Sequence, residues 1–282
     1  MIENGCKDKI LSKMHSFTNT ERKIAEYVLS HYEEVLNCNI TELSENAKVS
    51  DASVVRFCRS IGYRGYQDFK VNAARDVLPR GRHFNPALQE HDDPATICGK
   101  IIDSEISVLN RTLLGLDMKK VEKAADLIYK AGKIVLFGSG GSLLVGKDAL
   151  HKLLKIGIRA YVYEDMDLQL MASSLLEEKD VAIGISHSGS NCGVLKCLEN
   201  AKENGAFAIA LTGRGKTPIF NIADVAIETA SEQTIFQSES VSTRIAQLAI
   251  IDVLTAIAAF KNYDASYLAI QKTRLATSEN KF

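Results

Sequence analysis

The sequence predicts two unlike domains joined by a linker: an all-α domain, then an α/β domain with a five-stranded parallel sheet between helices. Two observations support this prediction. Residues 1–78 show only helical apolar spacing, whereas beyond about residue 130 short β-branched runs alternate with helix-length segments. Three of the four prolines, Pro79, Pro86 and Pro94, lie close together between the two patterns. The expected organisation is therefore 1–78, a linker at 79–95, an α/β domain at 96–262, and a C-terminal helix and tail at 263–282.

Composition narrows the class of protein. A chain of 282 residues with 46% hydrophobic and 24% charged residues indicates packed cores rather than disorder. The most apolar run, 246–260, is interrupted by Gln247, Asp252 and Thr255, so no membrane span is expected. The N-terminus has no signal-peptide core, and the six cysteines form no C-x-x-C pair. We therefore expect a cytoplasmic protein without a metal, a cofactor or a membrane partner.

The N-terminal helices follow from local signals. Residues 20–23 open a helix that carries Ile24, Ala25 and Val28 at helical spacing. Thr41 is expected to cap a short helix, and Lys48 and Val49 make a tight turn. Ser50 caps a second helix that reaches about Ser60 and is ended by Gly62. Two helices joined by a tight turn predict a helix-turn-helix, whose second helix enters the major groove of DNA.

The charge distribution agrees with DNA binding, although the whole chain has a formal net charge of only −1. Between Lys48 and Arg82 there are eight basic and three acidic residues, which gives this stretch +5 and the remainder −6. An ordinary solvated charged face is the alternative interpretation. The candidate DNA-binding residues are Ser50, Asp51, Ser53, Arg56, Arg59, Tyr66 and Lys70.

The second half alternates strands and helices. The predicted strands are 134–137, 160–163, 181–185, 207–211 and 225–227. The predicted helices are at about 96–115, 117–131, 143–155, 167–177 and 192–204. This alternation predicts a parallel sheet covered by helices on both faces.

Two loops rich in serine and glycine follow presumed strands, at 138–142 and 186–191. Ligands bind at the carboxyl ends of parallel strands, and helix N-termini favour anions, so the two loops predict a site for a phosphate and neighbouring sugar hydroxyls. A P-loop is rejected because Asp148 stands where Ser or Thr should bind magnesium. A dinucleotide-binding fingerprint is also rejected, because Leu143 stands at the position of its third glycine. The candidate ligand-binding residues are Ser139, Gly140, Gly141, Ser142, Ser186, Ser188, Gly189, Ser190, Asn191 and Glu239.

Residues 41–70, with the segment 18–25 before them, closely resemble the N-terminal helix-turn-helix of the RpiR family of bacterial transcription regulators. The two loops and the segment 240–254 resemble the SIS (sugar isomerase) domain of the same family, over about 100–260. The second loop departs from the common pattern, because Ser190-Asn191 stands where Glu-Thr is usual. Details of both loops resemble members that sense N-acetylmuramic acid 6-phosphate.

The resemblance implies a DNA-binding transcription regulator, with repression as the default, whose operator affinity is controlled by a phosphosugar. Its implied partners are operator DNA, the phosphosugar effector and further copies of itself in a homodimer or homotetramer. A sugar-phosphate isomerase is the alternative function, since SIS domains also occur in isomerases. His187 and Glu239 are the obvious candidates for its base, but the attached helix-turn-helix favours a sensor, so no catalytic residue is assigned.

Overall fold

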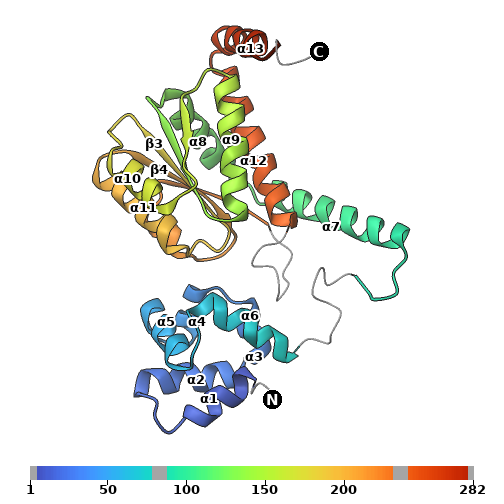
Figure 1. Cartoon of the computed structure of the whole chain (residues 1–282), viewed down its shortest axis with the longest axis vertical. Coiled ribbons are helices and arrows are strands. Elements are labelled where there is room, and N and C mark those ends of the chain that lie inside the picture. The colour runs from blue at the N-terminus through green and yellow to red at the C-terminus, as the bar shows by residue number, and fades with distance from the viewer. Residues whose placement is uncertain (1–4, 78–87, 231–240, 279–282) are drawn as a thin grey trace. The chain divides into compact units, whose positions relative to one another are not determined.

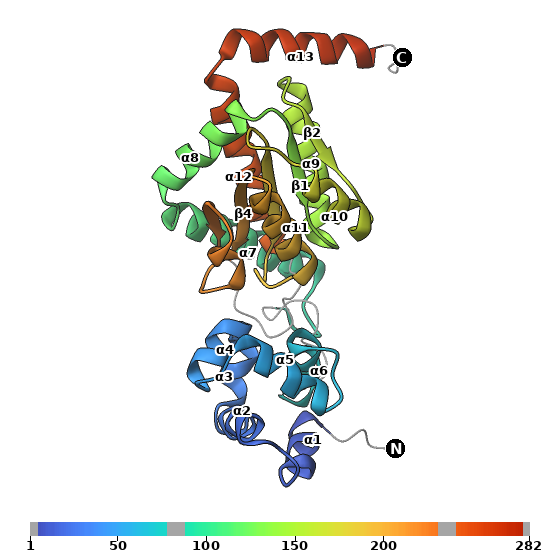
Figure 2. The same ribbon diagram turned by 90° about the vertical axis from the view of Figure 1, so that its left-hand side faces the viewer.

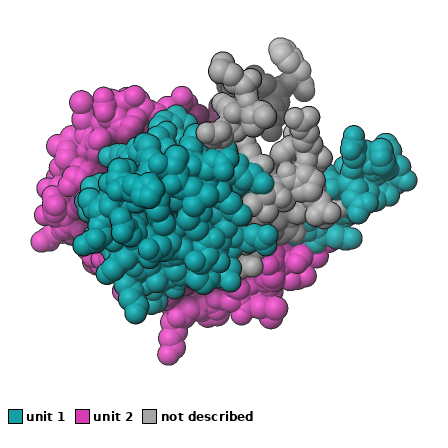
Figure 3. Space-filling model, turned by 90° about the horizontal axis from the view of Figure 1, so that it is seen from below, with its two compact units in different colours: residues 1–104, 215–217, 232–240 teal, residues 105–214, 218–231, 241–282 magenta. Residues whose placement is uncertain are grey.

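The computed structural model describes residues 5–77, 88–230 and 241–278. The chain forms two compact units, coloured separately in Figure 3. The first unit comprises residues 1–104, 215–217 and 232–240, and the second comprises the remainder.

Residues 5–77 of the first unit form only helices and connecting turns, as predicted. The helices are α1 (Cys6–Lys13), α2 (Asn19–Ser30), α3 (Tyr32–Asn37), α4 (Ile40–Asn46), α5 (Asp51–Ser60) and α6 (Tyr66–Val77). Their apolar faces meet in one core, where the rings of Phe17 and Phe57 lie 5.4 Å apart. This core fixes α5 against the other helices of the unit.

Two of the predicted helix starts need correction. α2 begins one residue before the predicted segment and is capped by Thr18, which forms a reciprocal capping box with Glu21. α4 is capped by Asn39, not by Thr41, because Asn39 and Glu42 form a second capping box. The predicted cap at Ser50 is confirmed, since its hydroxyl accepts a hydrogen bond from the Ser53 N–H at 3.3 Å.

The second unit contains a parallel sheet of the predicted size. Its strands are β1 (Ile134–Phe137), β2 (Ala160–Val162), β3 (Val181–Ser186), β4 (Phe207–Gly213) and β5 (Val225–Thr229). Their spatial order is β2-β1-β3-β4-β5, and every neighbouring pair is parallel. The chain therefore leaves β1 on one side toward β2 and returns on the other side to β3, which makes the gap between β1 and β3 the point where strand order reverses.

Helices cover both faces of this sheet (Figures 1 and 2). The helices α8 (Met118–Lys130), α9 (Gly141–Lys155) and α12 (Val241–Phe260) pack on one face, where Leu136 and Ile183 point. The helices α10 (Met166–Ser174) and α11 (Cys192–Glu203) pack on the other, where Phe137 and Ala182 point. A short 3-10 turn, η1 (Pro218–Asn221), precedes β5.

Two further helices lie at the borders of the predicted α/β domain. α7 (Pro94–Leu114) begins inside the predicted linker, because proline is well accommodated at the first position of a helix. Residues 79–87 of the predicted linker lie outside the described residues. α13 (Tyr263–Ser278) corresponds to the predicted C-terminal helix.

The helix α12 is strongly apolar along most of its length. By length and composition alone, Thr243–Phe260 would be long and apolar enough to cross a membrane. In the structure its buried residues, which include Ile250 and Leu254, join the core formed with α8 and α9. Asp252 on the same helix forms an ion pair with Lys152 of α9 at 2.5 Å. We therefore describe α12 as a core helix of the second unit.

Candidate DNA-binding and effector sites

The helices α4 and α5 are joined by the predicted tight turn. Lys48 adopts a left-handed conformation with φ of 56°, and the Val49 N–H donates to the Ser44 carbonyl at 2.9 Å. These contacts end α4 and turn the chain into α5 within four residues. The arrangement is a helix-turn-helix with α5 in the position of the recognition helix.

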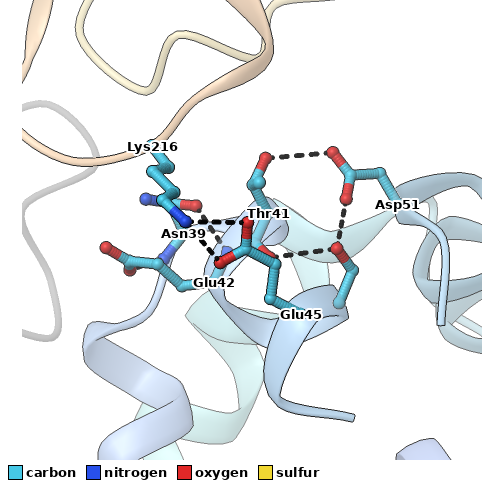
Figure 4. Close-up of polar contacts among 7 residues, drawn as sticks. Asn39, Thr41, Glu42, Glu45, Asp51 and Lys216 are labelled. Atoms are coloured by element: carbon cyan, nitrogen blue, oxygen red, sulfur yellow. Dashed lines mark hydrogen bonds and ion pairs between the residues drawn. The ribbon is translucent and has the colours of Figure 1, made fainter. Parts of the chain in front are cut away.

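Asp51 connects the two helices of this motif (Figure 4). One of its carboxylate oxygens accepts a hydrogen bond from the Thr41 hydroxyl at 3.0 Å, and the other accepts from the Ser44 hydroxyl. Both donors lie on α4. Each oxygen of the Asp51 carboxylate therefore holds a hydroxyl of α4, which links the start of α5 to α4.

The remaining predicted residues of α5 form a small polar network at its start. Ser53 is 8% exposed, and its hydroxyl lies 2.9 Å from that of Ser50. The Arg56 guanidinium donates to the Ser53 hydroxyl at 2.8 Å, while its side chain stays exposed. Arg59 is exposed one turn later and donates to the Arg64 carbonyl. Ser53 thus orients Arg56, and both arginines keep exposed side chains.

Two predicted contacts to the DNA backbone are not available. Tyr66 is 7% exposed, and its hydroxyl donates to the carbonyls of Val35 and Cys38, each at 3.0 Å. The Lys70 ammonium donates to the same Cys38 carbonyl at 2.8 Å. Burial lowers the pKa of Lys70 to about 8. Both side chains hold α6 to the end of α3 and do not serve as DNA-backbone contacts in this position.

The two predicted effector loops lie next to each other. The loop 138–142 follows β1 and the loop 187–191 follows β3, and these strands are neighbours in the sheet. Open α/β sheets bind ligands at the carboxyl ends of the strands where the strand order reverses. Both loops therefore lie at the topological switch point of the sheet.

The first loop brings backbone close to the expected ligand position. Gly140 caps α9 with φ of 55° and ψ of −128°, a combination that essentially only glycine adopts. A Cβ at Gly138 would lie 3.1 Å from the Leu143 nitrogen, so the start of α9 packs directly on that glycine. Ser139 and Gly140 are exposed, and Ser142 is half-buried in the first turn of α9. The loop thus presents backbone and hydroxyl donors at a helix N-terminus.

The second loop distributes its predicted residues between structural and exposed positions. Ser186 is the last residue of β3 and is 4% exposed, and its carbonyl accepts from the Gly189 N–H at 3.0 Å. Gly189 has a φ of +59°, and the Ser188 and Ser190 hydroxyls beside it are 3.1 Å apart. Asn191 caps α11 by accepting from Val194 N–H, so its oxygen is already used. Glu239 lies outside the described residues.

The structure adds a cation that sequence reasoning missed. Arg244, near the start of α12, places its guanidinium 3.4–3.7 Å from the position of a Cβ on Gly141. It therefore lies at the N-terminus of α9, beside the first loop. A cation at the positive end of a helix is electrostatically unfavourable unless an anion lies with it. More than a hundred residues separate Arg244 from this loop, so no local pattern could have revealed the contact.

The contacts of α9 agree with rejecting a P-loop. Gly146 lies within α9, where its Cα faces Leu136 and Ile185 of the sheet. Lys147 forms an ion pair with Glu164 at 2.5 Å. Neither residue belongs to the loop before the helix, where a phosphate-binding glycine and lysine would have to lie.

Comparison with known proteins decides the family. The rpiR-family helix-turn-helix domain matches residues 4–78, and the SIS domain matches residues 127–257. The chain is 34% identical over 248 residues to the HTH-type transcriptional regulator HexR of Escherichia coli, covering 88% of this chain and 85% of HexR. The chain belongs to the rpiR family. It is also 34% identical to an uncharacterized HTH-type transcriptional regulator of Caldanaerobacter subterraneus, over 94% of each chain.

One solved structure matches nearly the whole chain. The Vibrio vulnificus NanR protein, solved in complex with ManNAc-6P, matches with a TM-score of 0.82 at 25% identity, over 98% of this chain and 99% of NanR. The comparisons thus confirm the predicted fold of this rpiR-family protein, a helix-turn-helix domain followed by an SIS domain. They also confirm that it is an HTH-type transcriptional regulator.

Proposed function

We propose that this regulator binds operator DNA through α5 and that a phosphosugar bound at the two loops of the SIS domain controls this binding. The observation that carries the proposal is the pair of serine-glycine loops at the switch point of the sheet, joined there by Arg244. The name of NanR's ligand supports a phosphosugar as the class of effector. We expect the protein to act in the cytoplasm as a repressor that the effector releases.

The proposed effector site divides into a phosphate part and a sugar part. The start of α9 supplies N–H groups and the Ser142 hydroxyl, and Arg244 supplies a positive charge. The hydroxyls of Ser188 and Ser190 supply uncharged donors on the second loop. A phosphate satisfies both a helix N-terminus and a guanidinium, and sugar hydroxyls suit the serines.

Coupling between effector and DNA follows from two-fold assembly. We propose a homodimer, or a pair of dimers, because operators of this kind repeat their half-sites about 34 Å apart on one face of DNA. We propose that effector binding changes the spacing of the paired recognition helices. The operator affinity then changes by the same factor by which the effector affinity differs between the DNA-bound and the DNA-free protein.

A sensor agrees better than an isomerase with the position of His187. Its carbonyl accepts a hydrogen bond from Gly213 N–H at 2.9 Å. Its ring lies against the same glycine, since a Cβ there would be 3.0 Å from Nδ1. The imidazole therefore packs on the end of β4, whereas an isomerase base must reach the sugar carbons. We expect no interconversion of aldose and ketose phosphates.

The test uses the full-length protein. Thermal shift is measured with N-acetylmannosamine 6-phosphate, N-acetylmuramic acid 6-phosphate, glucose 6-phosphate and inorganic phosphate, each sugar phosphate against its unphosphorylated sugar. We expect at least one phosphosugar to stabilise the protein and to change its affinity for operator fragments selected from the source genome. Arg244→Gln should lower the affinity for that phosphosugar about tenfold or more. Arg274→Gln, on the exposed part of α13, should leave this affinity unchanged. Failure of every phosphosugar to bind would refute the proposed effector class.

A further inference from the structure

Gln169, on α10, makes three hydrogen bonds at the edge of the effector site although sequence reasoning gave it no role. Gln169 is 1% exposed. Its oxygen accepts from the Gly138 N–H at 3.1 Å, and its nitrogen donates to the carbonyls of Gly138 and Tyr163, each at 3.0 Å. Both the oxygen and the nitrogen of this buried amide group thus bond to the backbone at the ends of two strands.

The three bonds lie where the sheet opens. Leu136 of β1 is still paired with Val162 of β2, but the pairing ends there. One and two residues further on, the carbonyl of Tyr163 and both polar groups of Gly138 need other partners, since buried backbone groups are rarely left unpaired. The Gln169 amide supplies them, so it takes the place of a neighbouring strand. The ends of β1 and β2 therefore separate here, and the Gln169 amide group bridges the backbone that follows the two strands.

Gly138 packs directly on the backbone at the start of α9, so its position determines the position of the effector loop. A Cβ on Gly138 would lie 3.1 Å from the Ser142 carbonyl carbon and 3.1 Å from the Leu143 nitrogen. Backbone therefore packs on backbone at this point, with no flexible side chain between them. A shift of Gly138 must move the first turn of α9, which carries Ser142 and faces Arg244.

The helix that carries Gln169 also contacts the second loop's helix. A Cβ on Gly193, in the first turn of α11, would lie 2.6 Å from the sulfur of Met166, so this methionine packs on bare backbone. Met166 and Gln169 are three residues apart and lie on adjacent turns of α10. One short helix thus contacts the supports of both effector loops.

We propose that Gln169 is a positioning residue for effector binding, which holds Gly138 and through it the Ser142 end of α9 in the geometry that receives the phosphate. The proposal rests on the proposed function for its consequence, but its structural part can be tested without any ligand. Replacing the amide leaves Gly138 and Tyr163 without partners, so the first loop should become mobile while the rest of the sheet stays folded.

The first experiment measures amide hydrogen exchange by mass spectrometry in the unliganded full-length protein. We expect Gln169→Met to raise the exchange rate of peptides covering 136–143 about tenfold or more, and to leave peptides covering β4 unchanged. Asn200→Ala is the matched control, because it removes a hydrogen bond from α11 to Ser173 on α10 and leaves the Gly138 contact intact. Unchanged exchange at 136–143 in Gln169→Met would overturn the proposal, whatever the protein binds.

The second experiment uses Gln169→Glu and compares its affinity with that of the wild type at each pH from about 5 to 8. The introduced carboxylate, when ionised, would keep the bond from Gly138 N–H but would turn an oxygen toward two carbonyls, whereas its protonated form matches glutamine in shape and can donate to one of these carbonyls. With the phosphosugar that stabilises the wild type most, we expect a loss of about tenfold or more at pH 8 that is reduced toward pH 5. Dividing the affinity of the variant by that of the wild type at the same pH removes the effect of the titration of the phosphate itself.

The outcomes separate the two proposals. If no phosphosugar of the panel binds the wild type, the proposed function fails, and the exchange experiment still decides the role of Gln169. If the wild type binds but Gln169→Met, which can neither accept from the Gly138 N–H nor donate to the two carbonyls, has wild-type affinity at every pH, the positioning role is refuted. A loss of affinity in Gln169→Glu that grows as the pH rises through the pKa of the introduced carboxyl group supports it.

Discussion

At the scale of single residues, Arg56 has the properties of a base-reading side chain. It is exposed on α5, and the bond from its guanidinium to the Ser53 hydroxyl limits its orientation. We predict that Arg56→Ala weakens operator binding by about 1–3 kcal/mol and reduces discrimination between operator and unrelated DNA. Fluorescence anisotropy with both DNAs is the measurement. Arg159→Ala, an exposed arginine of the second unit, is the control, and equal losses in the two variants would contradict the assignment.

Lys70 shows how burial changes the chemistry of a residue that the sequence places in a basic stretch. Its pKa is lowered from 10.5 to about 8, chiefly because burial disfavours the charged ammonium. Between these values the unfolded chain binds more protons than the folded one. The contribution of Lys70 to the free energy of unfolding therefore rises with pH from about 8 to 10.5 and is lost as the pH falls through 8.

The free energy of unfolding of the wild type must be compared with that of a variant at each pH. Burial raises the pKa of cysteines and tyrosines in the same unit, such as Cys58 and Tyr63, so their contribution to stability falls as the pH rises. We predict that the wild type gains up to about 3 kcal/mol relative to Lys70→Met between pH 8 and 10.5. Urea denaturation of both proteins at several pH values measures it. A difference that is constant with pH would show that Lys70 is solvated like an ordinary lysine.

At the scale of elements, the helix-turn-helix depends on the link between α4 and α5. Asp51 accepts hydrogen bonds from Thr41 and Ser44, and Ser44 is only 3% exposed. We predict that Asp51→Ala lowers the free energy of unfolding of the first unit by about 1–3 kcal/mol and weakens DNA binding, while effector binding is retained. Urea denaturation and the phosphosugar thermal shift are the measurements. Asp8→Ala, an exposed acid in the first turn of α1, should change stability by only a few tenths of a kcal/mol.

The elements themselves were largely predictable, because their signals are local. The cap at Ser50 and the apolar runs of all five strands were sufficient to locate α5 and the sheet. Residues that act over long sequence separations were not predictable. Gln169 contacts Gly138 from 31 residues away, and Arg244 reaches Gly141 from another helix. Tyr66 was misassigned for a related reason, since a sequence pattern does not show that carbonyls of a distant turn will take its hydroxyl.

At the scale of the whole molecule, the net charge of −1 is the sum of two opposite parts. The stretch from Lys48 to Arg82 carries +5 and the rest of the chain carries −6. We therefore expect weak long-range attraction between the protein and DNA, with the basic stretch neutralising phosphates at close contact. Arg64, whose side chain is 92% exposed beside the recognition helix, is a candidate for such a phosphate contact.

The salt dependence of DNA binding tests this division of charge. We predict that log affinity falls linearly with log salt, and that Arg64→Ala reduces the slope by about one for each protomer that contacts DNA. Arg56→Ala should instead lower specific affinity more than non-specific affinity, because a base contact carries sequence information and a phosphate contact does not. Anisotropy titrations between about 50 and 300 mM potassium chloride measure the slope of log affinity against log salt for the wild type and for Arg64→Ala. Equal slopes in wild type and Arg64→Ala would mean that Arg64 meets no phosphate, and the neutralising charge would then have to come from other basic residues of this stretch, of which Lys48 and Arg59 are exposed.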